Sequence, residues 1–208
     1  MPEAIARVLT VPGCSHVLEA RERRRKGARM ALVAPPHPLY GGSIGNPVVR
    51  AIEQAFAQRD LDTLAFNFRG TGESTGEPSG DQADALVDYL AAARSVADAP
   101  LAWLSGYSFG SIAALAAAAT LSVPRVLMVA PPLALLDPAL LTRFEGTIAV
   151  AIGSDDEYAP VDALRTTFAA HPRTTVDIVE GTEHFFLGSA VRRLSDALTR
   201  LLDVLDGT

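Results

Sequence analysis

The chain has 208 residues, 49% of them hydrophobic and 20% charged, which is typical of a packed globular domain and excludes a disordered chain. Its formal net charge of −6 argues against a nucleic-acid partner, which would select a basic surface. No run approaches the ~18 uninterrupted apolar residues that a membrane span needs, so no membrane partner is expected.

Strand and helix patterns alternate along most of the chain. Residues 5–11 and 16–20 are rich in β-forming side chains and flank a Pro-Gly turn, which predicts an antiparallel hairpin. We then expect strands at 30–34, 63–68, 101–105, 125–130, 147–152 and 174–179. We expect helices at 46–58, 81–97, 109–121, 161–170 and 189–205.

The strands after the hairpin are continuous apolar runs instead of alternating ones. Such runs are typical of strands that are buried on both faces of a parallel sheet. Because helices separate these strands, we expect an α/β fold with helices on both faces. Segment 133–146 is too short to form a substantial cap. We therefore predict a single α/β domain over residues 1–208.

Two segments, 106–110 and 72–76, match the G-x-S-x-G pattern of a nucleophile elbow. This motif places a serine on a sharp turn between a strand and a helix, and the helix N-terminus favours negative charge there. Ser108 has a predicted strand before it and an alanine-rich helix after it. Ser74 lies among glycines and a proline, which indicates a turn. We predict Ser108 as the nucleophile, and a helix N-cap is its alternative role.

A serine hydroxyl becomes a strong nucleophile only when a neighbouring base takes its proton. His37 and His184 both follow predicted strands, where the crevice of a parallel sheet forms. The chain order serine, acid, histidine selects His184 as the base. The acid must orient this imidazole. A loop after a predicted strand offers three carboxylates for that role, those of Asp155, Asp156 and Glu157.

Two backbone N–H groups should bind the oxyanion that forms during acyl transfer. One is expected from Phe109, which follows the predicted nucleophile. The other should come from loop 35–42, where prolines cannot donate and His37, Leu39, Tyr40 and two glycines remain. From these we choose Leu39. We expect a mostly apolar substrate pocket, lined by Tyr40, Tyr107, Tyr158 and Phe185.

Six segments in order carry a family resemblance: PHPLYGGS (36–43), FNFRGTGES (66–74), GYSFGS (106–111), APP (130–132), GSDDEYAP (153–160) and EHFF (183–186). Together they resemble the small capless bacterial α/β-hydrolases, esterase-like enzymes related to the dienelactone hydrolase group. The resemblance implies the α/β-hydrolase fold, a mostly parallel central sheet with an N-terminal antiparallel hairpin, helices on both faces and no cap.

The resemblance also bears on single residues. The family's acid lies three residues after a glycine and four before a proline, which favours Asp156 and leaves Asp155 as the alternative. Dienelactone hydrolases use cysteine where this chain has Ser108, so that specific activity is not expected. Pro35 stands where the family's loop often has histidine.

These observations predict a carboxylesterase-like serine hydrolase that cleaves small carboxylic esters or thioesters. Its triad of Ser108, His184 and Asp156 would form an acyl-enzyme intermediate, without a cofactor or metal. A ligand-binding protein without turnover is the alternative on the same fold. Arg69 could bind a substrate carboxylate or tie down its own loop. The single cysteine, Cys14, favours a reducing compartment. We expect a cytoplasmic protein, either a monomer or a homodimer, with a small-molecule ester as partner.

Overall fold

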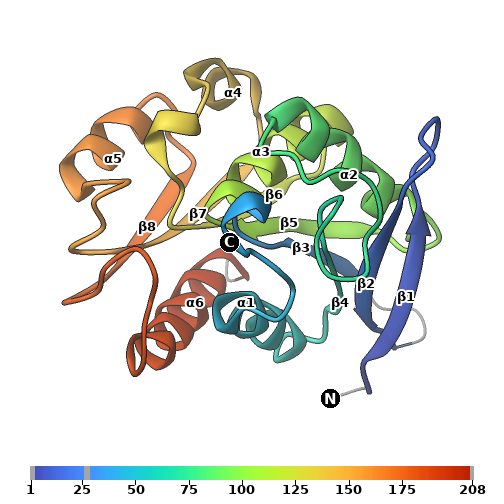
Figure 1. Cartoon of the computed structure of the whole chain (residues 1–208). Coiled ribbons are helices and arrows are strands. Elements are labelled where there is room, and N and C mark those ends of the chain that lie inside the picture. Colours follow the sequence, from blue (N-terminus) through green and yellow to red (C-terminus); the bar gives the residue numbers. More distant parts are fainter. Residues whose placement is uncertain (1–2, 26–28, 207–208) are drawn as a thin grey trace.

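The computed structural model describes residues 3–25 and 29–206. Within these residues, eight strands form one sheet in the order β1-β2-β4-β3-β5-β6-β7-β8 (Figure 1). The strands are β1 (Ile5–Thr10), β2 (Val17–Arg23), β3 (Met30–Ala34), β4 (Asp62–Phe66), β5 (Leu101–Tyr107), β6 (Arg125–Val129), β7 (Thr147–Gly153) and β8 (Thr174–Val179). Strand β2 is antiparallel to both β1 and β4, and the other neighbouring pairs are parallel.

Helices cover both faces of this sheet, as Figure 1 shows. They are α1 (Pro47–Ala57), α2 (Gln82–Arg94), α3 (Phe109–Leu121), α4 (Pro138–Arg143), α5 (Val161–Phe168) and α6 (Ala190–Asp206), with short 3₁₀ turns η1 (Pro38–Tyr40) and η2 (Leu133–Leu135). Helices α1 and α6 lie on one face, and α2 and α3 lie on the other. The predicted α/β architecture with an N-terminal antiparallel hairpin is confirmed.

The local sequence explains these elements. All residues of β3 and β4 are buried, because a central parallel strand has a helix layer on each face. Helix α1 begins where the Asn46 side chain accepts a hydrogen bond from the Val48 N–H, and Pro47 occupies the first turn. Helix α6 buries a stripe of leucines against the sheet: Leu194, Leu198, Leu201, Leu202 and Leu205.

Several elements end two or three residues away from their predicted bounds, as α2 (predicted to residue 97) and β5 (predicted to residue 105) do. Strand β2 continues to Arg23, beyond the predicted end at residue 20, because residues 20–23 pair with β4. The segment after β6, which was expected only to be too short for a cap, contains η2 and α4. Helix α4 starts at a recognisable signal, since the Asp137 side chain accepts a hydrogen bond from the Ala139 N–H.

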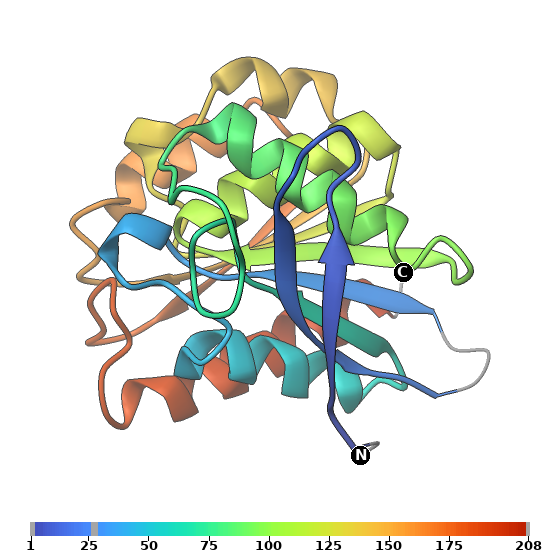
Figure 2. The ribbon, with the colours of Figure 1, turned by 45° about the vertical axis from the view of Figure 1, so that its right-hand side comes forward.

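The parallel strands bring their carboxyl ends to one edge of the sheet. The loops after β3, β7 and β8 gather there, at the left of Figure 2, around the junction of β5 and α3. In an open α/β sheet, this edge is where ligands bind. No helix in the described parts of the chain has the length and apolar character to cross a membrane.

Candidate active site

Ser108 occupies the sharp turn between β5 and α3. Its backbone has φ 52° and ψ −123°, a conformation that costs a non-glycine residue about 1–3 kcal/mol. A Cβ on Gly106 would lie 2.2 Å from the Gly110 carbonyl oxygen, and a Cβ on Gly110 would lie 2.3 Å from the Pro35 carbonyl oxygen. The G-x-S-x-G spacing therefore reflects close backbone approach on both sides of Ser108.

The second G-x-S-x-G match has a different environment. Ser74 is buried, and its hydroxyl accepts a hydrogen bond from the Glu19 N–H (2.8 Å) and donates one to the Asn67 carbonyl (3.1 Å). These bonds tie the loop after β4 to β2. Ser74 therefore has the turn-stabilising environment that its glycine-rich surroundings predict.

Three predicted site residues meet at the carboxyl edge of the sheet. The Ser108 Oγ lies 3.0 Å from the His184 Nε2, and the His184 Nδ1 lies 2.8 Å from the Asp156 Oδ2. His184 and Asp156 are 5% and 2% exposed, so their contact is largely shielded from water. They come from the loops after β8 and β7, and only the fold brings these distant segments to Ser108.

The loop after β7 places one of its three carboxylates against the imidazole. The second oxygen of Asp156 accepts hydrogen bonds from the N–H groups of Tyr158 (2.9 Å) and Ala159 (3.1 Å). Asp155 is exposed, and its carboxylate accepts a hydrogen bond from the Ser154 hydroxyl (3.1 Å). Glu157 is also exposed. Adjacent side chains of this loop thus point in different directions, and only Asp156 faces His184.

Tyr107 holds the loop that carries His184. Its buried hydroxyl donates a hydrogen bond to the carbonyl oxygen of His184 (3.0 Å). Burial, with a contribution from the negative charge of Asp156, raises the pKa of Tyr107 well above its usual value. The phenol therefore stays protonated and acts as a hydrogen-bond donor.

Backbone N–H groups near Ser108 differ in their availability. The Phe109 N–H begins α3, where the first amides have no intrahelical acceptor. The Leu39 N–H instead donates to the Nδ1 of His37 (3.3 Å), and Leu39 does not line the pocket beside Ser108. The prediction of Leu39 as the second oxyanion donor is therefore not supported, because a local turn already uses this amide.

His37 offers another amide in the same loop. His37 lines the pocket, and within the described part of the chain no acceptor is found for its N–H. Its imidazole packs between the rings of Phe109 and Tyr40, with centroid distances of 4.7 and 4.6 Å. Burial lowers the pKa of His37. Since Nδ1 accepts the Leu39 N–H, the neutral ring carries its proton on Nε2.

A pocket of about 360 Å³ opens beside Ser108. All four predicted pocket residues, Tyr40, Tyr107, Tyr158 and Phe185, line it. Its other walls include Pro132 and Leu135 from the segment after β6, and none of its described lining residues is Lys, Arg, Asp or Glu. Among the residues that the structure describes, no group of three His, Cys, Asp or Glu side chains is arranged to hold a metal ion.

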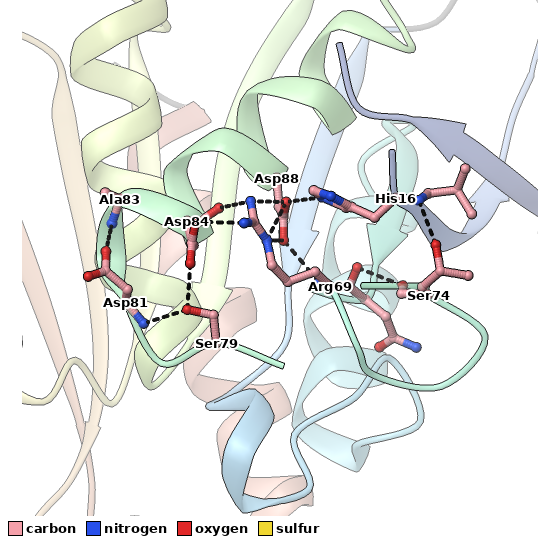
Figure 3. Close-up of polar contacts among 11 residues, drawn as sticks. His16, Arg69, Ser74, Ser79, Asp81, Ala83, Asp84 and Asp88 are labelled. Carbon is pink, nitrogen blue, oxygen red and sulfur yellow. Dashed lines mark hydrogen bonds and ion pairs between the residues drawn. The ribbon is translucent and has the colours of Figure 1, made fainter. Parts of the chain in front are cut away.

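Arg69 lies outside this pocket, in a partly buried charge network between the loop after β4 and α2 (Figure 3). Its guanidinium donates to Asp84 (2.6 Å) and to Asp88 (2.8 Å), and its backbone N–H also donates to Asp88 (2.9 Å). The hydrogen bonds to Asp88 raise the pKa of Arg69. Asp88 also contacts the His16 Nε2 (3.0 Å). Arg69 therefore ties down its loop, chiefly through carboxylates, and is not free to bind a substrate carboxylate.

We expect Asp88→Asn to lower the free energy of unfolding by about 3 kcal/mol, because Asp88 is fully buried and the loss of its charge leaves the partly buried Arg69 with Asp84 as its charged partner. For a chain of this size, the midpoint of thermal unfolding should fall by roughly 6–12 °C. Differential scanning calorimetry measures this. The control is Arg143→Gln, since Arg143 and Asp137 form an exposed pair at 3.9 Å. An equal shift in both variants would show that the Arg69 network contributes no more to stability than an exposed ion pair does.

Comparison with known proteins supports the same architecture. No model of a protein family matches the chain. The chain is 27% identical to an α/β serine hydrolase homologue from Coxiella burnetii, over 96% of this chain and 97% of that one, with a TM-score of 0.85. It is also 27% identical to a lidless α/β serine hydrolase of Xanthomonas campestris, over 98% and 95% of the two chains, with a TM-score of 0.80.

A relative found by comparison of sequences also matches. The chain is 29% identical over 175 residues to an uncharacterized protein of Rickettsia prowazekii (strain Madrid E), covering 76% of this chain and 72% of that protein. Strand order, elbow geometry and these matches show that the chain has the α/β-hydrolase fold. Within that class, it is similar to the α/β serine hydrolases without a lid, and the predicted resemblance to capless members is confirmed.

Proposed function

We propose that the chain is a serine hydrolase that cleaves small carboxylic esters or thioesters, with Ser108 as its nucleophile. The observation that carries this proposal is the continuous contact from the Ser108 Oγ to His184 (3.0 Å) and from His184 to Asp156 (2.8 Å). The strained backbone of Ser108 adds support, because strain of this kind persists where the surrounding fold imposes it, often at active sites.

In the proposed reaction, the Ser108 Oγ attacks the carbonyl carbon while its proton passes to the His184 Nε2. Asp156 holds the imidazole in the required tautomer and stabilises its cation. The protonated Nε2 then gives its proton to the leaving alcohol or thiol, and the acyl group stays on Ser108. Water, activated by the same imidazole, hydrolyses this ester and restores the serine.

The oxyanion that forms on the carbonyl oxygen needs two donors aimed at one point. We assign these roles to the backbone N–H groups of Phe109 and His37. The assignment is supported by the position of Phe109 at the start of α3 and by the unused His37 amide at the pocket wall. Gly42 permits this loop to turn tightly, since a Cβ there would lie 2.2 Å from the Pro36 carbonyl oxygen.

The pocket supports an uncharged substrate. Its described walls carry no formally charged side chain, and aromatic rings form much of its surface. A charged acyl or alcohol group would lose hydration there without gaining a partner. Segment 133–146 contains only η2 and α4 and builds no cap over the pocket. Esters or thioesters with short acyl groups are therefore the proposed substrates.

A fluorophosphonate probe and a series of p-nitrophenyl esters with two to twelve acyl carbons test the proposal. We expect one phosphonate per chain, bonded to Ser108 after fluoride leaves, and peptide mass spectrometry identifies the site. We also expect kcat/KM to be greatest for the short esters. A protein that is neither labelled nor active on any ester would contradict the proposal, and ligand binding without turnover would then become the leading interpretation.

A further inference from the structure

The mouth of the pocket concentrates exposed apolar side chains. Among the described residues, eleven large hydrophobic side chains are exposed. Four of them line this single pocket: Tyr40, Leu135, Tyr158 and Phe185. Exposed apolar groups that gather around one concave site, instead of lying scattered, indicate a binding surface.

Two of these rings flank the imidazole of His184. The Tyr158 ring lies 4.6 Å from it and the Phe185 ring lies 5.3 Å from it, measured between centroids. Tyr158 is 48% exposed and Phe185 is 52% exposed, so each ring keeps a free surface. The two rings are 6.3 Å apart at an interplanar angle of 80°, which is an edge-to-face arrangement.

Backbone contacts fix the positions of both rings relative to the proposed catalytic groups. The Tyr158 N–H donates to Asp156, whose other carboxylate oxygen contacts His184. Phe185 directly follows His184 in the chain. The interactions that orient the imidazole therefore also place these two rings.

The chemistry of ester cleavage decides which part of a substrate meets them. The leaving-group oxygen must come within hydrogen-bond reach of the His184 Nε2, because it receives its proton from that nitrogen. The group attached to this oxygen then passes along the imidazole, where Tyr158 and Phe185 form the wall. The carbonyl oxygen is directed elsewhere, toward the backbone amides of the oxyanion site.

We propose that Tyr158 and Phe185 form a subsite for an aromatic leaving group, and that they determine specificity for the alcohol side of the ester. This inference rests on the hydrolase function proposed above. An aromatic ring fits the subsite because it can complete the edge-to-face cluster, and the absence of charged residues from the described walls suits an uncharged group. Leu187, in the same loop, is 68% exposed but does not line the pocket.

The test compares benzyl acetate with allyl acetate. Both esters have the same acyl group and a primary alcohol next to an sp² carbon, so their intrinsic reactivities are similar and the ring is the main difference. The wild type should have the higher kcat/KM for benzyl acetate. We expect Tyr158→Ala and Phe185→Ala each to lower the benzyl-to-allyl ratio by roughly threefold to tenfold. Tyr158→Phe keeps the ring and should keep the ratio, and Leu187→Ala is the matched surface control.

The ratio separates recognition from a structural role. If the alanine variants lower kcat/KM for both esters by the same factor, the rings only position His184 and the inference is wrong. An equal loss of the ratio in Leu187→Ala would also overturn it. If the wild type hydrolyses neither ester and takes up no fluorophosphonate, the hydrolase proposal itself fails, and this inference fails with it.

Discussion

Ser108→Ala is expected to lower kcat for p-nitrophenyl acetate by roughly a millionfold and to abolish fluorophosphonate labelling. The variant keeps the Cβ and the backbone turn but removes the oxygen that lies 3.0 Å from the His184 Nε2. No acyl-enzyme can then form, and only binding and the oxyanion donors can accelerate attack by water. Stopped assays at high protein concentration, with labelling followed by mass spectrometry, measure both effects.

The chain supplies a matched control in its second G-x-S-x-G segment. Ser74→Ala removes a hydroxyl whose hydrogen bonds, among the described residues, go to the backbone of Glu19 and Asn67. It should reduce thermal stability while leaving labelling of the folded protein intact. Circular dichroism verifies that both variants are folded under the assay conditions. Labelling that survives in Ser108→Ala and disappears in Ser74→Ala would reverse the assignment of the nucleophile.

Asp156→Asn is expected to lower kcat by roughly ten-thousandfold while the protein keeps its fold. An asparagine amide at this position cannot stabilise the imidazolium by charge and can favour the wrong tautomer of His184. Asp156 is 2% exposed and lies 2.8 Å from the His184 Nδ1, so solvent cannot replace its carboxylate. Steady-state kinetics with p-nitrophenyl acetate measure the loss.

Asp155→Asn is the neighbouring control for this prediction. Its carboxylate is exposed and contacts the Ser154 hydroxyl, so kcat should change by no more than a few-fold. The rate of fluorophosphonate labelling should follow the same order in the two variants, because it also depends on the activated serine. A larger loss in Asp155→Asn than in Asp156→Asn would mean that the loop after β7 presents the other acid to His184 in solution.

Much of the fold could be predicted because burial leaves a direct trace in sequence. A strand covered on both faces must be apolar throughout, and helices such as α1 and α6 show a 3.6-residue apolar period. The extension of β2 to Arg23 could not be predicted in this way, since residues 21–23 are charged. Pairing with β4 places these residues in the sheet, and the Arg21 and Glu22 side chains find ion-pair partners in Glu53 and Arg7.

The elbow was recognisable from sequence because backbone contact demands glycine at fixed positions. Gly106 and Gly110 each meet backbone oxygens within 2.3 Å of a hypothetical Cβ, and no other residue fits there. The motif alone did not separate Ser108 from Ser74, but the strand before it and the helix after it did. Sequence context was sufficient at this position because the elbow is a local structure.

Sequence by itself determined the parallel sheet, the elbow at Ser108 and the order of the candidate groups, because these depend on burial and on local backbone sterics. Tertiary structure decided which atoms meet. It placed Asp156 and not Asp155 on His184, it paired Arg69 with Asp88, and it brought His37 and not Leu39 to the wall of the pocket. Neighbouring residues of a loop can carry the same chemical group and point in different directions. Only the packed structure therefore shows which of them makes a given contact.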